Sequence, residues 1–144
     1  QDFLNNINTW YDEHLKGNLD AILSNTSGCG TTMKDYGFIF RDDKKMKKKA
    51  KKISELTKDV SEYLFENLNL KFKKKEKKLR IAYHSACSMQ HGQKIHSQPM
   101  NLLQKTKNEI LEIPEGHICC GSAGTYNLLQ KNRNTTCTLT IRFK

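Results

Sequence analysis

The first half of the chain alternates between helical and extended hydrophobic patterns. Residues 1–16 carry apolar side chains at helical spacing and predict a helix. Residues 19–25 form a short apolar run that predicts a buried strand, and a glycine-rich loop follows it. We expect a second helix to begin near Thr31 or Thr32. The clearest helix is predicted over residues 42–66, because one apolar stripe runs along it, made of Met46, Ala50, Ile53, Leu56, Val60, Tyr63 and Leu64.

The second half repeats this alternation with shorter elements. Residues 79–83 predict a strand, and residues 88–96 are polar and irregular. Pro99 suits the first turn of a helix over 99–105, and residues 109–113 alternate like a strand. Residues 125–130 predict the first turns of another helix. Alternating strands and helices of this kind predict an α/β fold with a parallel sheet flanked by helices.

Cysteines follow three of the predicted strands. Cys29 comes after the first strand, Cys87 after the strand over 79–83, and Cys119 and Cys120 after the strand over 109–113. Ligands of parallel α/β sheets gather outside the carboxyl ends of the strands. We therefore expect cysteine loops at the carboxyl ends of strands, with all four thiols on one edge of the sheet.

The adjacent pair Cys119-Cys120 carries the strongest chemical signal. Neighbouring cysteines rarely bond to each other, because the ring that they would close is strained. Gly121 and the small residues after it let the backbone approach a bulky group, and the helix expected next favours negative charge at its N-terminus. Two thiolates in such a loop suit a metal centre, and a negative iron–sulfur cluster would fit. The five cysteines of the chain also favour metal or redox use over a disulfide framework.

Two lysine runs, over 44–52 and 71–78, produce most of the net charge of +10. Such runs occur in patches for nucleic acid or anionic membranes, and also on solvated helix faces. We favour solvated helix faces, because the runs hold no arginine and only one aromatic residue, so base stacking has little support and we expect no nucleic-acid partner. No apolar run reaches the roughly 18 residues of a membrane span, and no signal peptide opens the chain. We expect a cytoplasmic protein or a peripheral subunit on the inner membrane, and, since Gln1 begins it, a processed chain or a piece of a longer one.

Three other kinds of site remain open from the residues alone. A structural zinc site would combine the thiols with histidines, chosen from His84, His91, His96 and His117. A thiol hydrolase would use Cys120 as nucleophile and His84 as base, although the sequence places no Asp or Asn to orient that histidine. Thiol–disulfide exchange at Cys119 and Cys120 is a third alternative.

Three motifs together resemble a known family. They are Gly28-Cys29-Gly30-Thr31-Thr32-Met33, Ala82-Tyr83-His84-Ser85-Ala86-Cys87 and Cys119-Cys120-Gly121-Ser122-Ala123-Gly124. Their order resembles the cysteine-rich CCG domain of heterodisulfide reductase subunits, and most of all the iron–sulfur subunits of glycolate oxidase. In that domain, which is usually repeated, a lone cysteine precedes the Cys-Cys-Gly and a later cysteine closes the set.

The resemblance implies an electron-transfer subunit of an oxidoreductase, with no catalytic residue for substrate in this chain. Cys29 would ligate one 4Fe-4S cluster, and Cys87, Cys119 and Cys120 another, beside Gly121. His84 and His117 would lie in the surrounding shell and donate hydrogen bonds to sulfur. Flavoprotein partner subunits with FAD would oxidise glycolate to glyoxylate, and electrons would pass towards a quinone or another membrane-linked acceptor. Related subunits act with lactate or glycerol 3-phosphate dehydrogenases, which is the alternative.

The resemblance also divides the chain. Residues 1–40 would end a first CCG repeat, 41–78 would form the helix and lysine-rich connection, and 79–130 would form a second repeat. Residues 131–144 depart from the family pattern, because they are polar and then β-like. The closing cysteine of the second repeat would lie beyond the last residue, and Cys137 in the tail is a poor substitute.

Overall fold

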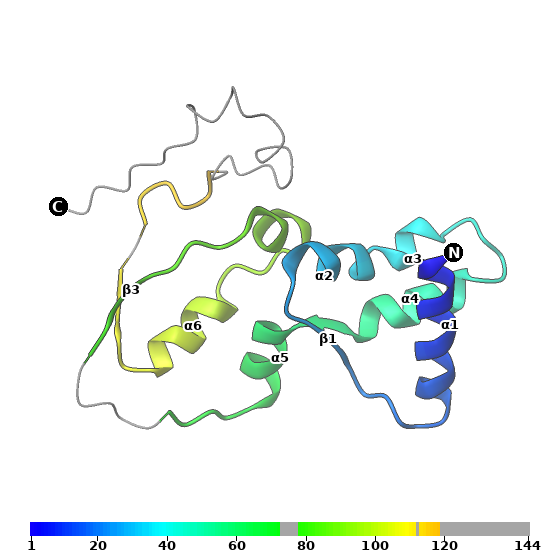
Figure 1. Cartoon of the computed structure of the whole chain (residues 1–144), viewed down its shortest axis with the longest axis horizontal. Coiled ribbons are helices and arrows are strands. Elements are labelled where there is room, and N and C mark those ends of the chain that lie inside the picture. The colour runs from blue at the N-terminus through cyan, green and yellow to red at the C-terminus, as the bar shows by residue number, and fades with distance from the viewer. Residues whose placement is uncertain (73–77, 112, 119–144) are drawn as a thin grey trace.

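The computed structural model describes residues 1–72, 78–111 and 113–118. Along this part of the chain, helices alternate with short strands, and the strands pair in parallel, so the predicted α/β class is confirmed (Figure 1). The predicted single sheet is not found in the described residues. The strands form two separate parallel pairs, β1 with β2 and β3 with β4.

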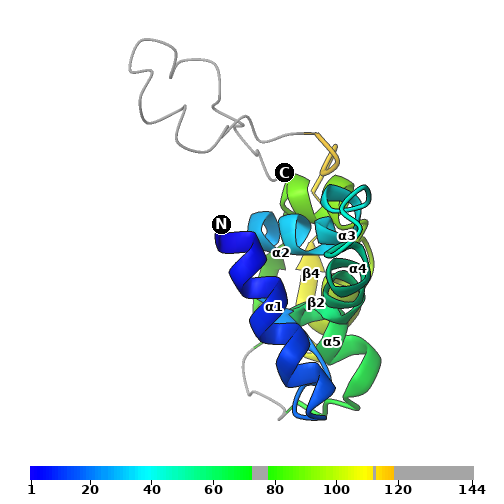
Figure 2. The same cartoon turned by 90° about the vertical axis from the view of Figure 1, so that its right-hand side faces the viewer.

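The first strand pair belongs to a helical unit. Helix α1 (Asp2–Leu15) ends as predicted, with Gly17 at a φ of +75°. Strand β1 (Ile22–Ser24) leads into α2 (Ser27–Lys34) and the short α3 (Tyr36–Ile39). Helices α1 and α4 (Lys47–Leu56) cross and pack against each other, as Figure 2 shows. The core lies among these elements and consists of Ile7, Ile22, Tyr36, Met46, Ala50 and Ile53.

The helix predicted over 42–66 is wrong in its middle. A strand, β2 (Thr57–Asp59), interrupts it, and α5 (Val60–Asn67) begins afterwards. The apolar stripe concealed this break because its spacing continues through the strand. Two sets of hydrogen bonds cause the break. Strand β2 pairs with β1, and Asp59 caps α5 in a capping box with Glu62.

The second strand pair is formed by β3 (Arg80–Ala82) and β4 (Glu109–Leu111). Between them lie a π-helical turn, η1 (Ser88–Gly92), and α6 (Gln98–Lys105). The predicted strands and the helix with Pro99 in its first turn are confirmed, whereas η1 replaces the irregular segment that we expected. Helix α6 packs on α5, and η1 packs on α2, so both contacts join the two halves (Figure 1).

Candidate functional site

Cys29 lies inside the first turn of α2, where we had predicted a loop. The helix begins at Ser27, since the Gly30 N–H donates to the Thr26 carbonyl at 2.9 Å, and the hydroxyls of Thr31 and Thr32 donate to the carbonyls of Ser27 and Gly28. Thr26, the N-cap residue, forms no side-chain cap. The first N–H groups of a helix have no acceptor within it, so this turn offers donors and a positive dipole end to an anionic group.

The Cys29 thiol is exposed beside a hollow between α1 and α2. The hollow has a volume of about 550 Å³ and is lined by Phe3, Asn6, Thr26, Gly28, Cys29, Thr32, Met33 and Tyr36. A Cβ atom built on Gly28 would meet no described atom within 4 Å. The space next to the thiol is therefore open, as a bulky thiolate-bound group requires.

Cys87 directly precedes η1 and is partly buried. The turn that follows it packs closely on α2. Glycines make the approach possible: a Cβ on Gly30 would lie 2.7 Å from Nε2 of Gln93, and a Cβ on Gly92 would lie 2.7 Å from Cγ2 of Thr31. The structure thus brings the helix of Cys29 against the segment of Cys87, although their strands belong to different sheets.

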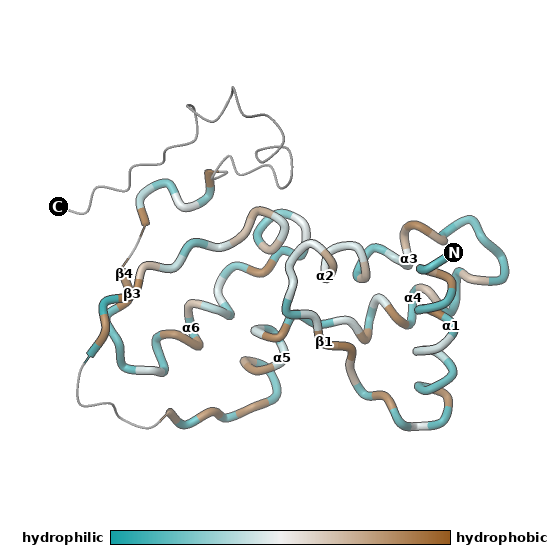
Figure 3. Tube along the Cα trace, viewed as in Figure 1, coloured by the Kyte–Doolittle hydropathy of each residue, from teal (hydrophilic) through white to brown (hydrophobic). Residues whose placement is uncertain are grey.

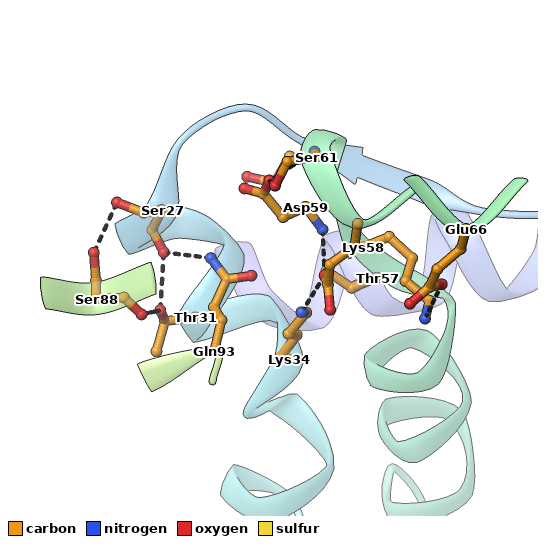
Figure 4. Close-up of polar contacts among 12 residues, drawn as sticks. Ser27, Thr31, Lys34, Thr57, Lys58, Asp59, Ser61, Glu66, Ser88 and Gln93 are labelled. Atoms are coloured by element: carbon orange, nitrogen blue, oxygen red, sulfur yellow. Dashed lines mark hydrogen bonds and ion pairs between the residues drawn. The ribbon is translucent and has the colours of Figure 1, made fainter. Parts of the chain in front are cut away.

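Polar groups hold this contact together (Figure 4). The hydroxyl of Ser88 donates to that of Ser27 at 2.7 Å. The Thr31 hydroxyl lies 2.8 Å from the Ser27 carbonyl and 3.1 Å from the Ser88 carbonyl. Nε2 of Gln93 donates to the same Ser27 carbonyl at 2.9 Å. These four residues were missed by the sequence reasoning, because serine, threonine and glutamine carry no recognisable signal for a contact across about 60 residues of chain.

A second polar cluster lies at the carboxyl end of β2. Asp59 is buried and accepts hydrogen bonds from the backbone N–H and the hydroxyl of Ser61. Glu62 accepts the Asp59 N–H and pairs with Lys34 of α2 (Figure 4). Every charged group of this cluster has a partner, which favours a structural role. The Asp-x-x-Glu spacing of a capping box could have revealed it from sequence.

Cys29 and the contact with η1 lie on different sides of α2. Ser27 and Thr31 face η1, whereas Cys29, two residues from each, is rotated by about 200° around the helix. Cys29 accordingly lines the hollow with α1 instead of the contact with η1. The expectation that Cys29 and Cys87 share one edge stays a prediction, although β1 and β3, the strands that precede them, belong to separate pairs.

The other predicted ligands cannot be placed. Cys119, Cys120 and Gly121 lie outside the described residues, as does Cys137. His84 is partly buried and His117 is exposed, and their predicted place beside a cluster stays a prediction. Within the described part of the chain, no three His, Cys, Asp or Glu side chains gather to hold a metal ion. A zinc site formed by described residues alone therefore has no support.

In the described ranges, no helix combines the length and the apolar character that crossing a bilayer requires.

Comparison with known proteins supports the motif analysis. Residues 81–141 match the family of the cysteine-rich domain CCG, so the predicted resemblance is confirmed there. The chain is 36% identical over 128 residues to the glycolate oxidase iron–sulfur subunit of Escherichia coli, covering 86% of the chain and 30% of that protein. It is 29% identical over 117 residues to the probable glycolate oxidase iron–sulfur subunit of Bacillus subtilis, covering 78% of the chain and 26% of the relative.

Lactate utilization protein A of Bacillus subtilis is also similar, with 28% identity over 110 residues that cover 76% of the chain and 46% of that protein. The chain thus spans less than half the length of these curated relatives. No solved structure matches it.

Proposed function

We propose that this chain is the cluster-ligating part of a glycolate oxidase iron–sulfur subunit, which carries electrons from flavoprotein partners towards a quinone. The observation that carries the proposal is the 36% identity to the Escherichia coli subunit over nearly the whole chain. The exposed thiol of Cys29 beside an open hollow, at an uncapped helix start, fits a thiolate ligand of an anionic cluster.

Two clusters of the 4Fe-4S type would be ligated. Cys29 would serve the first, and Cys87, Cys119 and Cys120 the second, with Gly121 letting the backbone approach. The placement of Cys29 across α2 from η1 supports two separate sites. When bound, such clusters accept and release single electrons, with a potential that hydrogen bonds to sulfur adjust.

The residues of the chain would bind and shield the clusters and perform no substrate chemistry. First-turn N–H groups of α2 would offset the negative charge beside Cys29. His84 and His117 would donate hydrogen bonds to the sulfurs of the second cluster, which raises its potential. Glycolate oxidation to glyoxylate would belong to FAD-containing partners, with this subunit in the cytoplasm or on the inner face of the membrane.

Iron and acid-labile sulfide, measured after anaerobic reconstitution, test the proposal. We expect both in the wild type, with a loss in Cys120→Ser. Cys29→Ser should change them little in this chain, because Cys29 alone cannot hold a 4Fe-4S cluster. Cys137→Ser is the matched control and should keep both elements. A chain extended through a further closing cysteine should bind more iron than this one. If neither this chain nor the extended chain binds iron, the proposal is wrong.

A lactate-linked complex is the second candidate, since lactate utilization proteins match the same region. Reconstitution with the flavoprotein subunits separates the two. Electron transfer to a quinone that depends on glycolate supports the first assignment, and transfer that depends on lactate alone replaces it with the second.

A further inference from the structure

An apolar pair lies exposed at the end of α3. The side chains of Phe38 and Ile39 are 66% and 45% exposed, respectively, whereas Tyr36 in the same helix is buried in the core. Figure 3 shows this hydrophobic stretch directly before the hydrophilic loop that leads to α4, at one end of the molecule. Two neighbouring apolar side chains with this exposure form a small apolar patch, which is a surface for contact with another molecule.

The sequence that follows this pair is strongly basic. Between residues 38 and 52 the chain has eight basic and only two acidic residues. Lys44, Lys45 and Lys48 are exposed. Of the two acids, Asp43 is occupied in accepting the backbone N–H groups of Lys45 and Met46, at 2.8 and 3.0 Å. Asp42 is exposed and lies 3.6 Å from Nε of Arg41.

Arg41 fixes the charge next to the aromatic ring. Its guanidinium carbon lies 4.0 Å from the centroid of the Phe38 ring, and Nη1 donates to the Phe38 carbonyl at 2.8 Å. This cation–π contact holds an apolar group and a positive group at one place on the surface. We call the surface formed by Phe38, Ile39, Arg41, Lys44, Lys45 and Lys48 the basic tip.

A hollow extends the basic tip along α4. It has a volume of about 370 Å³, lies between α1 and α4, and is lined by Tyr11, His14, Leu15, Lys48, Lys51, Lys52 and Glu55. Leu15 at its rim is 68% exposed. Three lysines around a concave surface suit a phosphate-containing headgroup, and Glu55 is the one acidic side chain in this lining.

We infer that the basic tip docks on an anionic lipid surface. Lysines attract anionic headgroups, while exposed phenylalanine and isoleucine side chains insert into the boundary between headgroups and acyl chains. Nucleic acid fits less well, because Arg41 covers one face of the only exposed ring of the tip and hinders base stacking. An acidic protein would match the lysines but gives the apolar pair no defined place.

Vesicle co-sedimentation with the 144-residue chain tests the inference. We expect binding to vesicles of equal parts phosphatidylglycerol and phosphatidylcholine, falling with added salt, and little binding to phosphatidylcholine alone. The charge reversal Lys44→Glu/Lys45→Glu should weaken binding about tenfold or more. Phe38→Ser/Ile39→Ser should also weaken it about tenfold but leave the salt dependence intact. Asp42→Asn should strengthen it.

The matched control reverses two charges in the other lysine run, as Lys71→Glu/Lys78→Glu. It should keep most of the binding, because both residues lie outside the basic tip. All substituted residues are exposed, so circular dichroism should show an unchanged fold. Equal loss in the control and the tip variant would overturn the inference, since net charge alone would then explain binding. Equal binding to both vesicle types, or binding to an oligonucleotide and to no vesicle, would overturn it as well.

Discussion

The two strand pairs are equally short, but they rest on very different packing. Around β1 and β2, six hydrophobic side chains are buried in one cluster, and seven further ones pack against it in part. None of the residues in β3 or β4 is buried. In the described residues of that second half, the buried apolar side chains are Ile95 and Pro99.

The second half is therefore held largely by its neighbour. Its closest contact, between η1 and α2, uses the hydroxyls of Ser27 and Ser88 and the amide of Gln93. Such hydrogen bonds specify a position well, but each adds only about 1 kcal/mol to stability. Cys29 is therefore carried by elements that share their own hydrophobic core, whereas the position of Cys87 depends on the contact between η1 and α2.

Core truncation should produce the largest difference between the halves. Ile53→Ala removes a fully buried side chain from the main core and should lower the free energy of unfolding by about 3 kcal/mol. Ile95→Ala removes an equally buried side chain from the thin half, where it should open η1 and α6 locally. Urea unfolding followed by circular dichroism gives the first effect, and amide hydrogen exchange resolves the second. If Ile95→Ala speeds exchange throughout α4 as much as Ile53→Ala does, the two halves unfold as one and the comparison fails.

Replacing two glycines of α2 with alanine should distinguish the side of the helix that contacts η1 from the side that faces open space. Gly30→Ala places a methyl group against Gln93 and should cost about 1 kcal/mol, with loss of the bond from Gln93 to Ser27. Gly28→Ala meets open space and should be neutral or stabilising by up to about 1 kcal/mol, because alanine favours the helix. Thermal melting of both variants measures the pair. Equal destabilisation would show that Gly28 also lies at a packed contact.

A double-mutant cycle measures the contact between α2 and η1 directly. Ser27→Ala and Ser88→Ala each remove one hydroxyl of the bond at 2.7 Å, and each should cost about 1 kcal/mol. Together they should cost clearly less than the sum, because the bond is lost only once. Urea unfolding gives the free energy of unfolding of each of the four proteins, and the midpoints can be compared where the m-values are equal. Additive effects would mean that this bond does not couple α2 to η1.

The smallest effect concerns the exposed ion pair of Glu13 and Lys16 at the end of α1. Hydrogen bonding from Lys16, and then from Asn18, holds the pKa of Glu13 below its ordinary value of 4.5. A carboxylate with a lowered pKa in the folded state adds stability above its unfolded pKa and loses it as pH falls through the folded value. The wild type should therefore lose slightly more stability than Glu13→Gln between pH 7 and pH 3. Melting temperatures across that range measure it. A wild-type advantage over Glu13→Gln that grows as pH falls would contradict the stated sign.

Sequence patterns located most elements because local physics creates them. The apolar spacing of α1, the proline at the start of α6 and the alternation in β4 each act within a few residues. The motifs around Cys29, Cys87 and Cys119 also sufficed to identify the CCG resemblance, now matched over residues 81–141. Family likeness is thus a property of the sequence itself.

Only the tertiary structure decided how these parts meet. The pairing of β1 with β2 divided a continuous helical pattern at Thr57, because strand bonds and the Asp59 cap outweighed the helical spacing. Contact with η1 turned Ser27 and Thr31 to one side of α2 and left Cys29 on the other. The sequence by itself determined which residues carry thiols and where most of the helices lie. The side of α2 that Cys29 faces depended on contacts between residues distant in the chain, and a local pattern does not encode those contacts.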